Sequence, residues 1–426
     1  MSKATLYNDK KKTLVPQLRF QEFDGVWKSF SINELVNKKI LDKPLDGNHG
    51  NIHPVSSDFV SSGIPFVMAN CFRDGKLLIE RAVCIRKEQA DKLQKGFSIK
   101  DDVLLTHKGS VGLTAIVPKL DTEYIMLTPQ VTYYRILKPE ILINVFLKST
   151  FETTLFQKRL KVLADGGTRP YIGITMQRIL NISIPANHSE QKKIASFLSE
   201  VDEKIQQLTR KISLLDQYKK GVMQQLFSGK LRFKYENEKD YPKWEEKKLG
   251  EYLIYKSNRN KDFKVELVLS VSNKKGFISQ DEQFDGYEVA SKDLSNYKIV
   301  DKNDIAYNPS RINVGSIARL IKYEKGIVSP MYVVFSLKNN LNEIFFENLY
   351  NTHRFKHLIK VGCSGSVRDS LNFEDLAEFK FKFPCLEEQQ KIAKFLSDID
   401  SKIEKANQQL AQTQTFKKGL LQQMFV

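Results

Sequence analysis

Two histidine pairs have the four-residue spacing at which imidazoles can share a metal ion. His49 and His53 lie in a segment rich in Gly, Asn and Pro, which predicts a loop. His353 and His357 lie in a segment with helical spacing, but no Glu stands between them as in the His-Glu-x-x-His zinc motif. The second pair is better explained by a solvated basic helix face, and neither pair predicts a metal site.

The motifs that bind catalytic cofactors are also missing from the sequence. It contains no Gly-x4-Gly-Lys-[Ser/Thr] phosphate loop and no glycine fingerprint of a dinucleotide fold at a strand–helix turn. Asn308-Pro309-Ser310-Arg311 departs from the Asn-Pro-Pro-aromatic motif of amino-methyltransferases, because it lacks the second Pro and the aromatic residue. The sequence therefore predicts a chain that binds its target, holds no cofactor of its own and leaves chemistry to others.

The net charge favours a polyanionic partner. The 426 residues include 67 Lys and Arg against 50 Asp and Glu, a formal charge of +17. Such a surplus binds phosphates through direct contacts and counterion release, so nucleic acid is the expected partner. A solvated basic surface, or a preference for ribosomal or membrane material, would give the same charge.

Side chains that can contact phosphates or base edges gather in loops that recur along the chain. These loops mix Lys or Arg with Ser, Thr, Asn and Gln, although polar Gly-rich turns are often only turns. The arginines among them could pair with guanine edges or with phosphates. The candidate DNA contacts are Asn70, Arg73, His107, Lys108, Ser110, Gln130, Thr168, Arg169 and Tyr171, and then Lys274, Lys275, Ser310, Arg311, Asn313, Ser364, Ser366 and Arg368.

A long amphipathic helix is the element that must position these loops. Residues 190–230 carry apolar residues every seven positions, with a second row four residues after the first, and no Pro or Gly before Gly221. Such a stripe, flanked by Lys, Glu and Gln, predicts a helix of about 55 Å that packs against another helix.

The partner helix lies in the same chain, because the sequence repeats itself. Residues 388–426 align with residues 190–228 without a gap after a shift of 198, and the match includes residues that a helical seam does not need. The repeat predicts a duplicated unit of about 200 residues. The predicted seam comprises Ile194, Leu198, Val201, Ile205, Leu208, Ile212, Leu215 and Val222 in one helix, and Ile392, Leu396, Ile399, Ile403, Leu410 and Leu420 in the other.

Each repeat begins with an aromatic lead-in and continues as a mixed domain before its long helix. In the first domain, residues 64–70, 102–106, 113–117 and 130–136 are predicted strands of an antiparallel set, and residues 141–162 are a predicted helix. In the second, residues 267–272 and 304–307 are predicted strands and residues 344–359 a predicted helix. The two domains share the order of their predicted strands and helix while their loop residues differ, as expected of two modules that bind two targets.

With both helices and both lead-ins in view, the chain resembles the DNA-specificity subunit of type I restriction–modification systems. The resemblance covers nearly the whole chain. It rests on the Leu-Arg-Phe…Trp lead-ins (residues 18–27 and 231–244) and on Glu-Gln-x-Lys-Ile-Ala-x-Phe-Leu-Ser-x-x-Asp-x-Lys-Ile at the start of both helices. The third motif that supports the resemblance is Tyr-Lys-Lys-Gly-Val-Met-Gln-Gln-Leu-Phe-Ser-Gly-Lys-Leu-Arg-Phe (residues 218–233).

The resemblance implies an α+β fold with a pseudo-twofold internal repeat. Two mixed α/β target-recognition domains would be separated by two long antiparallel coiled-coil helices. Each domain would recognise one half of a split DNA sequence, and the helices would set the gap. The implied divisions are a tail (residues 1–17), domain 1 (18–187), the central helix (188–230), domain 2 (231–386) and the C-terminal helix (387–426).

The resemblance also implies partners and their cofactors. Double-stranded DNA, two modification subunits with S-adenosylmethionine and two restriction subunits with ATP and Mg²⁺ would join the chain. The scattered cysteines, the absence of a signal-peptide pattern and the lack of a bilayer-length apolar run predict a cytoplasmic protein that does not enter membranes.

Two other functions remain open from the sequence. One is a coiled-coil scaffold without a DNA role, and the other is a self-sufficient nuclease or methyltransferase, which the missing cofactor motifs disfavour.

Overall fold

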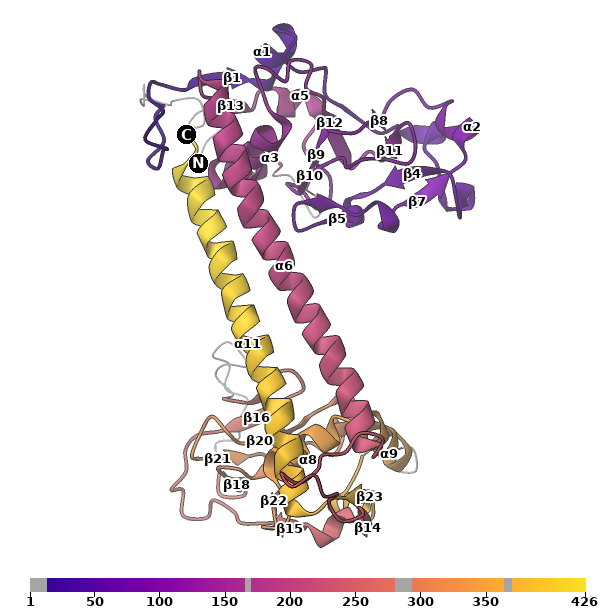
Figure 1. The fold of residues 1–426 in the computed structure, drawn as a ribbon, viewed down its shortest axis with the longest axis vertical. Helices are drawn as coiled ribbons and strands as arrows, with labels where there is room; N and C mark the ends of the chain where they lie inside the picture. Colours follow the sequence, from indigo (N-terminus) through magenta and orange to yellow (C-terminus); the bar gives the residue numbers. More distant parts are fainter. Residues whose placement is uncertain (1–13, 165–169, 280–292, 364–369) are drawn as a thin grey trace. The chain divides into compact units, whose positions relative to one another are not determined.

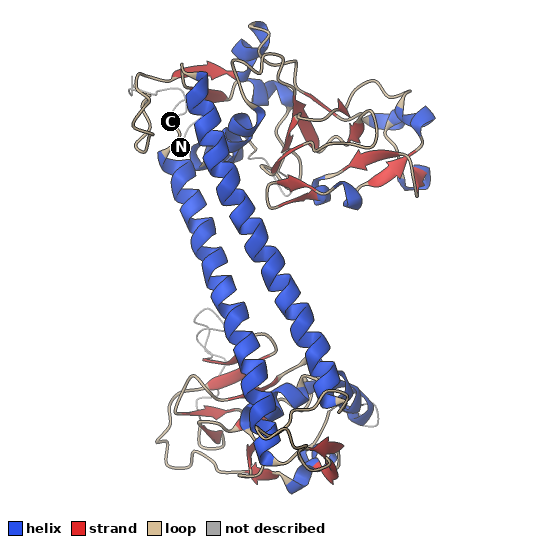
Figure 2. Ribbon diagram, in the orientation of Figure 1, coloured by secondary structure: helices blue, strands red, loops and turns tan. Residues whose placement is uncertain are grey.

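A computed structural model of the chain describes residues 14–164, 170–279, 293–363 and 370–426. The chain forms two compact units. The first comprises Met1–Thr209 with Gln408–Val426, and the second comprises Arg210–Asn407. Each unit combines helices with short strands (Figure 2), which is the α/β domain class expected from the sequence.

Two long helices dominate the chain (Figure 1). α6 spans His188–Phe227 and α11 spans Leu386–Gln423, which are 40 and 38 residues and therefore each close to 60 Å long at about 1.5 Å per residue. Both begin just before the Glu-Gln dipeptide shared by the two repeats. Gly221 lies inside α6, which continues through it to Phe227, and a Cβ at this position would meet no atom within 4 Å.

Within each unit the two helices pack antiparallel. In the first unit Ile194, Leu198 and Val201 share one apolar cluster with Leu420 and Met424, so residues early in α6 meet residues late in α11. In the second unit the order reverses, because Val222 and Leu226 cluster with Ile392, Leu396 and Ile399. Of the other predicted seam residues, Leu208 is buried, and Ile205, Ile212, Leu215, Ile403 and Leu410 are partly exposed.

An ion pair recurs between the helices in both units. Lys219 lies 2.6 Å from Asp400 in the second unit, and Lys417 lies 2.8 Å from Asp202 in the first. These are equivalent residues under the 198-residue shift, with the roles of the two helices exchanged. The repeat is thus visible in side-chain contacts as well as in sequence.

A buried carboxylate ties each lead-in to the start of a long helix. Glu190 accepts from Arg19 Nε and Nη2, both at 2.8 Å, and from Trp27 Nε1 at 3.3 Å. Its counterpart Glu388 accepts from Arg232 at 3.1 and 2.7 Å and from Trp244 Nε1 at 2.9 Å. Burial strengthens these charge-assisted bonds, so each lead-in is fixed on its helix.

The next residue of each helix caps a helix of the adjoining domain. Gln191 Oε1 accepts from Ile143 N at 3.2 Å, and its Nε2 donates to Ile141 O. Gln389 makes the same pair of bonds to Asn342 N and Asn340 O. The shared Glu-Gln dipeptide therefore holds the lead-in with one side chain and the domain with the other.

The first domain is built from two two-stranded sheets, two larger sheets and several short helices. β1 pairs with β13, and the larger sheets have the orders β10-β9-β12-β2 and β3-β7-β4-β11-β8. The elements are β1 (Lys28–Ser31), α1 (Ile32–Asn37), β2 (Leu45–Asp46), β3 (Phe59–Val60), β4 (Ile64–Val67), β5 (Phe72–Arg73), β6 (Lys76–Leu77), β7 (Val83–Ile85), α2 (Lys87–Ala90), β8 (Phe97–Ser98), β9 (Val103–Thr106), β10 (Thr114–Ile116), β11 (Ile125–Leu127), β12 (Val131–Tyr134), α3 (Asn144–Glu152), α4 (Thr154–Leu163), α5 (Ile174–Arg178) and β13 (Asn181–Ile184).

The second domain repeats this plan with fewer strands among its described residues. β14 pairs with β23 as β1 does with β13, and a four-stranded sheet has the order β15-β22-β19-β20. The elements are β14 (Glu245–Lys248), β15 (Leu253–Lys256), β16 (Leu269–Ser272), β17 (Gly276–Ser279), β18 (Lys298–Asp301), β19 (Ile305–Tyr307), β20 (Ile317–Arg319), β21 (Lys325–Val328), β22 (Val333–Leu337), α8 (Glu343–Tyr350), α9 (His353–Cys363), α10 (Phe373–Ala377) and β23 (Lys380–Phe383).

Two details of the sequence prediction are wrong. β4 does not join β9, β10 and β12 but lies in the other sheet, where it runs parallel to β11. Each predicted domain helix is also two helices. Thr153 leaves the helical conformation and caps α4 by accepting from Phe156 N, and Thr352 accepts from Phe355 N in the same way near the start of α9.

Candidate nucleic-acid interface

Gln130 and His107 bring three loops of the first domain together. Gln130 Oε1 accepts from Ala69 N at 3.3 Å, and its carbonyl accepts from His107 N at 2.9 Å. The carbonyl of His107 in turn accepts from Ile172 N at 3.0 Å. Residues around positions 70, 107 and 171, which are far apart in sequence, are thereby held at one place.

His107 itself does not belong to the exposed surface, so its prediction as a DNA contact is wrong. Its side chain is fully buried, and Nδ1 lies 2.9 Å from Ile172 O. Burial lowers the pKa of His107, although the Ile172 carbonyl and Asp46, 3.9 Å from Nε2, act in the opposite direction. A neutral imidazole fits this position, where the side chain positions two loops instead of contacting a ligand.

Lys108 and Tyr171, which lie beside the bond between His107 and Ile172, are exposed. Lys108 forms an isolated bridge with Tyr171, and its Nζ lies 5.9 Å from the centre of the Tyr171 ring. The Tyr171 side chain is 47% exposed. A lysine beside an exposed aromatic ring offers both a phosphate contact and a stacking surface, so these two residues stay candidate contacts.

The remaining candidates of the first domain differ in exposure. Asn70, Arg73 and Ser110 are exposed, while Gln130 is partly buried because it braces the loop at Ala69. The loop after β9 ends at Gly112, whose φ of +98° suits glycine and whose carbonyl accepts from Gln157 Nε2 at 2.9 Å. Thr168 and Arg169 lie outside the described residues.

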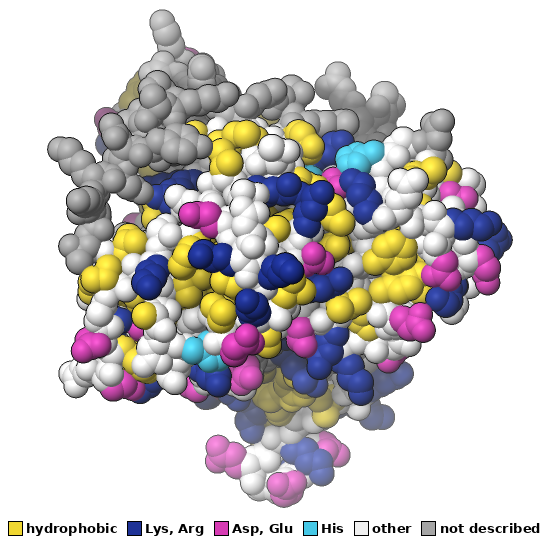
Figure 3. Space-filling model, turned by 90° about the horizontal axis from the view of Figure 1, so that it is seen from above, with side chains coloured by type: hydrophobic (Ala, Val, Ile, Leu, Met, Phe, Trp, Pro, Cys, Tyr) yellow, Lys and Arg dark blue, Asp and Glu magenta, His cyan; other side chains and the backbone are white. Residues whose placement is uncertain are grey.

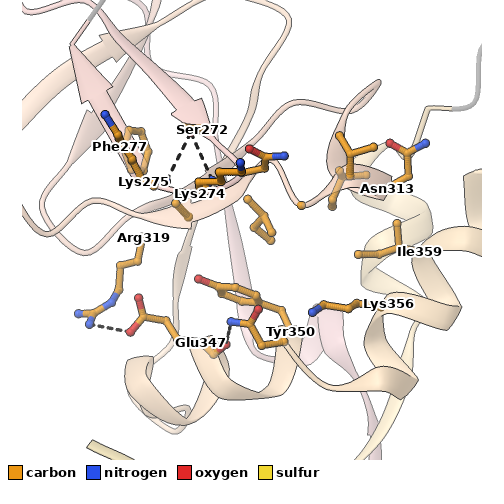
Figure 4. A pocket seen from close by; sticks show the side chains of 18 of the residues that line it. Ser272, Lys274, Lys275, Phe277, Asn313, Arg319, Glu347, Tyr350, Lys356 and Ile359 are labelled. Carbon is orange, nitrogen blue, oxygen red and sulfur yellow. Dashed lines mark hydrogen bonds and ion pairs between the residues drawn. The ribbon is translucent and has the colours of Figure 1, made fainter. Parts of the chain in front are cut away.

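In the second domain a hairpin and a turn form one wall of a cleft (Figure 4). The cleft has a volume of about 650 Å³ and is lined by the β16–β17 turn, by the turn before β20 and by α8 and α9. Lys274 and Lys275 lie at the tip of the hairpin, where their backbone N–H groups donate to Ser272 Oγ at 3.3 and 3.4 Å. Asn313 lines the same cleft, so three predicted contacts converge there.

Ser310 and Arg311 lie on the turn that leads to Asn313, and both are exposed. The turn is held by its own first residue, because Asn308 Oδ1 accepts from Ser310 N at 3.1 Å and its carbonyl accepts from Arg311 N at 3.0 Å. Gly315, with a φ of +93°, ends the turn at the position equivalent to Gly112. Ser364, Ser366 and Arg368 lie outside the described residues.

Sequence reasoning missed Arg319, Lys322 and Lys356, which line the cleft from β20, from the loop after it and from α9. Arg319 forms an ion pair with Glu347 at 2.9 Å and donates a hydrogen bond to Asn303 Oδ1 at 2.8 Å. None of these three basic residues belongs to a Gly-rich loop, so only knowledge of the fold could have grouped them with Lys274.

Both domains anchor their loops with the same backbone bond. Pro309 takes the place of His107, and its carbonyl accepts from Leu371 N as that of His107 accepts from Ile172 N. The strands before these loops start after a buried aspartate in each repeat. Arg135 pairs with Asp102 at 2.8 Å, and Lys256 pairs with Asp304 at 2.7 Å. The scaffold is therefore shared, and the exposed side chains on it are different.

Basic side chains are not gathered into a single patch on the face drawn in Figure 3. On the face drawn in Figure 3, Lys and Arg side chains are dispersed among acidic and hydrophobic ones. Among the described residues, no three His, Cys, Asp or Glu side chains are grouped so as to hold a metal ion. The four cysteines, all within the described ranges, form no disulfide, and no helix in those ranges could cross a membrane.

Comparison with known proteins identifies a family. Residues 25–216 and 241–413 match the model of the type I restriction modification DNA specificity domain. Two specificity subunits of Methanocaldococcus jannaschii type I restriction enzymes, MjaX and MjaIX, are 28% and 27% identical over 265 and 169 residues. These matches cover 59% and 38% of this chain and the same shares of each relative, less than two thirds of their length.

Solved structures share the fold. The S subunit of a type I restriction–modification system from M. genitalium superposes with a TM-score of 0.58 at 19% identity, over 97% of this chain and 99% of that one. A chain from a study of assembly and conformational transition in a type I system gives a TM-score of 0.54 at 13% identity, over 94% and 98%.

Proposed function

Because the chain belongs to the family of type I restriction–modification DNA specificity subunits, which are non-catalytic, we propose that it selects one split, asymmetric DNA sequence for its complex. Each target-recognition domain, residues 18–187 and 231–386, binds one half of that sequence. The long helices, residues 188–230 and 387–426, set the length of the gap between the halves.

One observation supports this proposal most strongly. The two domains hold their loops with equivalent bonds, His107 O to Ile172 N and Pro309 O to Leu371 N, yet the exposed residues on those loops differ. Lys108 follows His107 as Ser310 follows Pro309, and Tyr171 precedes Ile172 as Ser370 precedes Leu371. A shared frame with different side chains suits the recognition of two unlike half-sequences.

The partners follow from the family. Two modification subunits with S-adenosylmethionine methylate adenine at the selected sequence, and two restriction subunits use ATP and Mg²⁺. The chain holds none of these cofactors and acts in the cytoplasm. Its own contribution is to bind double-stranded DNA through the two sets of loops.

Binding measured with the modification subunits present tests the second set of loops. Lys274→Ala with Lys275→Ala should weaken binding to the methylated sequence. It should also reduce the slope of log affinity against log salt by about 0.9 for each lysine that contacts a phosphate. Lys394→Ala on α11 removes an equally exposed lysine and should leave both quantities unchanged.

An assembled complex in which the paired variant binds that sequence with unchanged affinity and salt slope would contradict the assignment of these loops. A complex that shows no preference for any DNA sequence would favour the scaffold function instead.

A further inference from the structure

A second cleft lies in the second unit, where α6 ends and the lead-in begins. It has a volume of about 1030 Å³, and its apolar floor is formed by Met223, Phe227, Trp244, Leu349 and Phe381. The buried Glu388 fixes part of this floor, because it accepts from both Trp244 and Arg232. The candidate DNA contacts of this domain that the structure describes do not line it.

The rim of this cleft is basic. Lys220, Lys243, His353, Arg354 and Lys382 line it together with Arg232, and none of its described lining residues is Asp or Glu. Arg354 is held over Phe381 with its guanidinium carbon 5.4 Å from the ring centre, and it donates to Lys380 O at 3.0 Å. Within the described part of the chain, Lys220, Lys243 and Lys382 have no carboxylate partner.

The first repeat shows that this rim is not part of the common frame. Val26 precedes Trp27 as Lys243 precedes Trp244, and Ser183 pairs in β13 where Lys382 pairs in β23. Leu155 follows the cap of α4 where Arg354 follows the cap of α9. Lys243, Lys382 and Arg354 therefore belong to the second repeat alone, whereas Arg232 and Lys220 have the basic counterparts Arg19 and Lys418 in the first.

The first repeat also shows what covers such a floor. Trp27 is only 2% exposed, and its backbone N–H donates at 2.8 Å to the carbonyl of Leu14, whose side chain packs on the same cluster. Phe425 packs edge-on against Trp27 with ring centres 6.0 Å apart. Trp244 is partly exposed, so the equivalent apolar surface in the second repeat is open.

We propose that this cleft is a docking site for an acidic amphipathic segment of a protein partner. The apolar side chains of that segment cover Trp244 and Met223, and its carboxylates meet Arg354, Lys382 and Lys243. An apolar groove with a rim of one charge is suited to a helix or strand of opposite charge. A DNA duplex carries its phosphates outside and gains nothing from an apolar floor, so a peptide fits better.

Tryptophan fluorescence of the full chain tests this directly, because the chain has two tryptophans and Trp27 is buried. The probe is a short synthetic peptide in which Leu and Phe recur at helical spacing among Glu residues. Its counterpart with Lys in place of Glu and a short DNA duplex are the comparisons. We expect the acidic peptide alone to protect Trp244 from acrylamide quenching in a saturable manner.

Variants make the result specific. Arg354→Glu with Lys382→Glu changes two exposed residues and should weaken peptide binding about tenfold or more. Lys394→Glu on α11 changes an exposed lysine outside this cleft and should not change peptide binding, and Trp244→Phe should remove the signal. The absence of saturable protection by the acidic peptide, or equal protection by the duplex, would overturn the proposal.

Discussion

At the scale of single residues, the fold depends on two buried carboxylates that the sequence presents only as part of a repeated dipeptide. Glu190 and Glu388 are both fully buried, and each neutralises one arginine and satisfies one indole N–H. Hydrogen bonding to Glu388 raises the pKa of Arg232. A charge-assisted pair of this kind is costly to break, because the surviving partner stays desolvated.

Glu388→Gln should therefore lower the free energy of unfolding by about 2–3 kcal/mol, because Arg232 loses its counter-charge. The midpoint of urea unfolding measures the change. Glu387→Gln alters the exposed neighbour and should have almost no effect. Equal midpoints for the two variants would show that the buried pair does not stabilise the fold.

His107 makes the stability of the first domain depend on pH. Because burial lowers its pKa in the folded protein, the unfolded chain binds the proton first as pH falls below its ordinary value of 6.5. The stability that the neutral ring provides is therefore complete above that pH and is lost as pH falls toward the folded pKa.

His107→Gln removes this titration. The difference in unfolding free energy between the natural chain and the variant should shrink as pH is lowered from 7 to 5, at a rate of up to about 1.4 kcal/mol per pH unit. Thermal unfolding followed by circular dichroism across this range would show it. A difference that stays constant would mean that His107 does not titrate in this range.

At the scale of elements, the two repeats attach their domains to the helices differently. In the first unit Glu152 of α3 lies 2.6 Å from Lys148 and 2.8 Å from Lys417 of α11, and it accepts from Thr114 at 2.8 Å. Burial opposes the ionisation of Glu152, but the two lysines outweigh it and lower its pKa. In the second unit Asn351 takes the place of Glu152.

Glu152→Asn gives the first repeat the residue of the second. We expect the free energy of unfolding to fall by about 1–3 kcal/mol, because Lys148 and Lys417 remain partly buried and keep only Asp202 as a carboxylate partner. Hydrogen exchange of α3 amides should rise at the same time. Unchanged exchange in α3 would show that this network does not couple the domain to the helices.

The sequence predicted the elements that obey a strong period and missed those that depend on distant contacts. α6 and α11 were predictable because their stripe continues for about ten turns. β4 was misassigned because its pairing with β11 is set by residues 60 positions away. The break at Thr153 was missed because apolar spacing continues across it, although the Thr that caps α4 is a recognisable signal.

The same distinction holds for the candidate site. Lys274, Lys275 and Asn313 could be singled out as candidate DNA contacts because turns rich in polar residues are recognisable in a sequence. The fold brings these three residues to one cleft. His107 was misjudged because its type and position resemble those of its exposed neighbours. Its burial depends on Ile172 and Asp46, which lie more than 60 positions away.

At the scale of the whole molecule, the proposal assigns the gap of the DNA site to the length of the helices. Inserting one heptad into both α6 and α11 lengthens each by about 10 Å, and seven residues nearly preserve the rotational phase. The gap should increase by about three base pairs at 3.4 Å each, with both half-sequences unchanged. A methylation map of cells with the inserted chain measures it. An altered half-sequence, or an unchanged gap, would contradict the helices as spacers.

The most direct test of the central claim is a methylation map of a restriction-deficient host that expresses the cognate modification subunit, with and without this chain. We predict a new adenine mark at one split motif that appears only when the chain is present. If the complex assembles and no new mark appears, the chain does not direct methylation, and its assignment as the DNA-recognition subunit is contradicted.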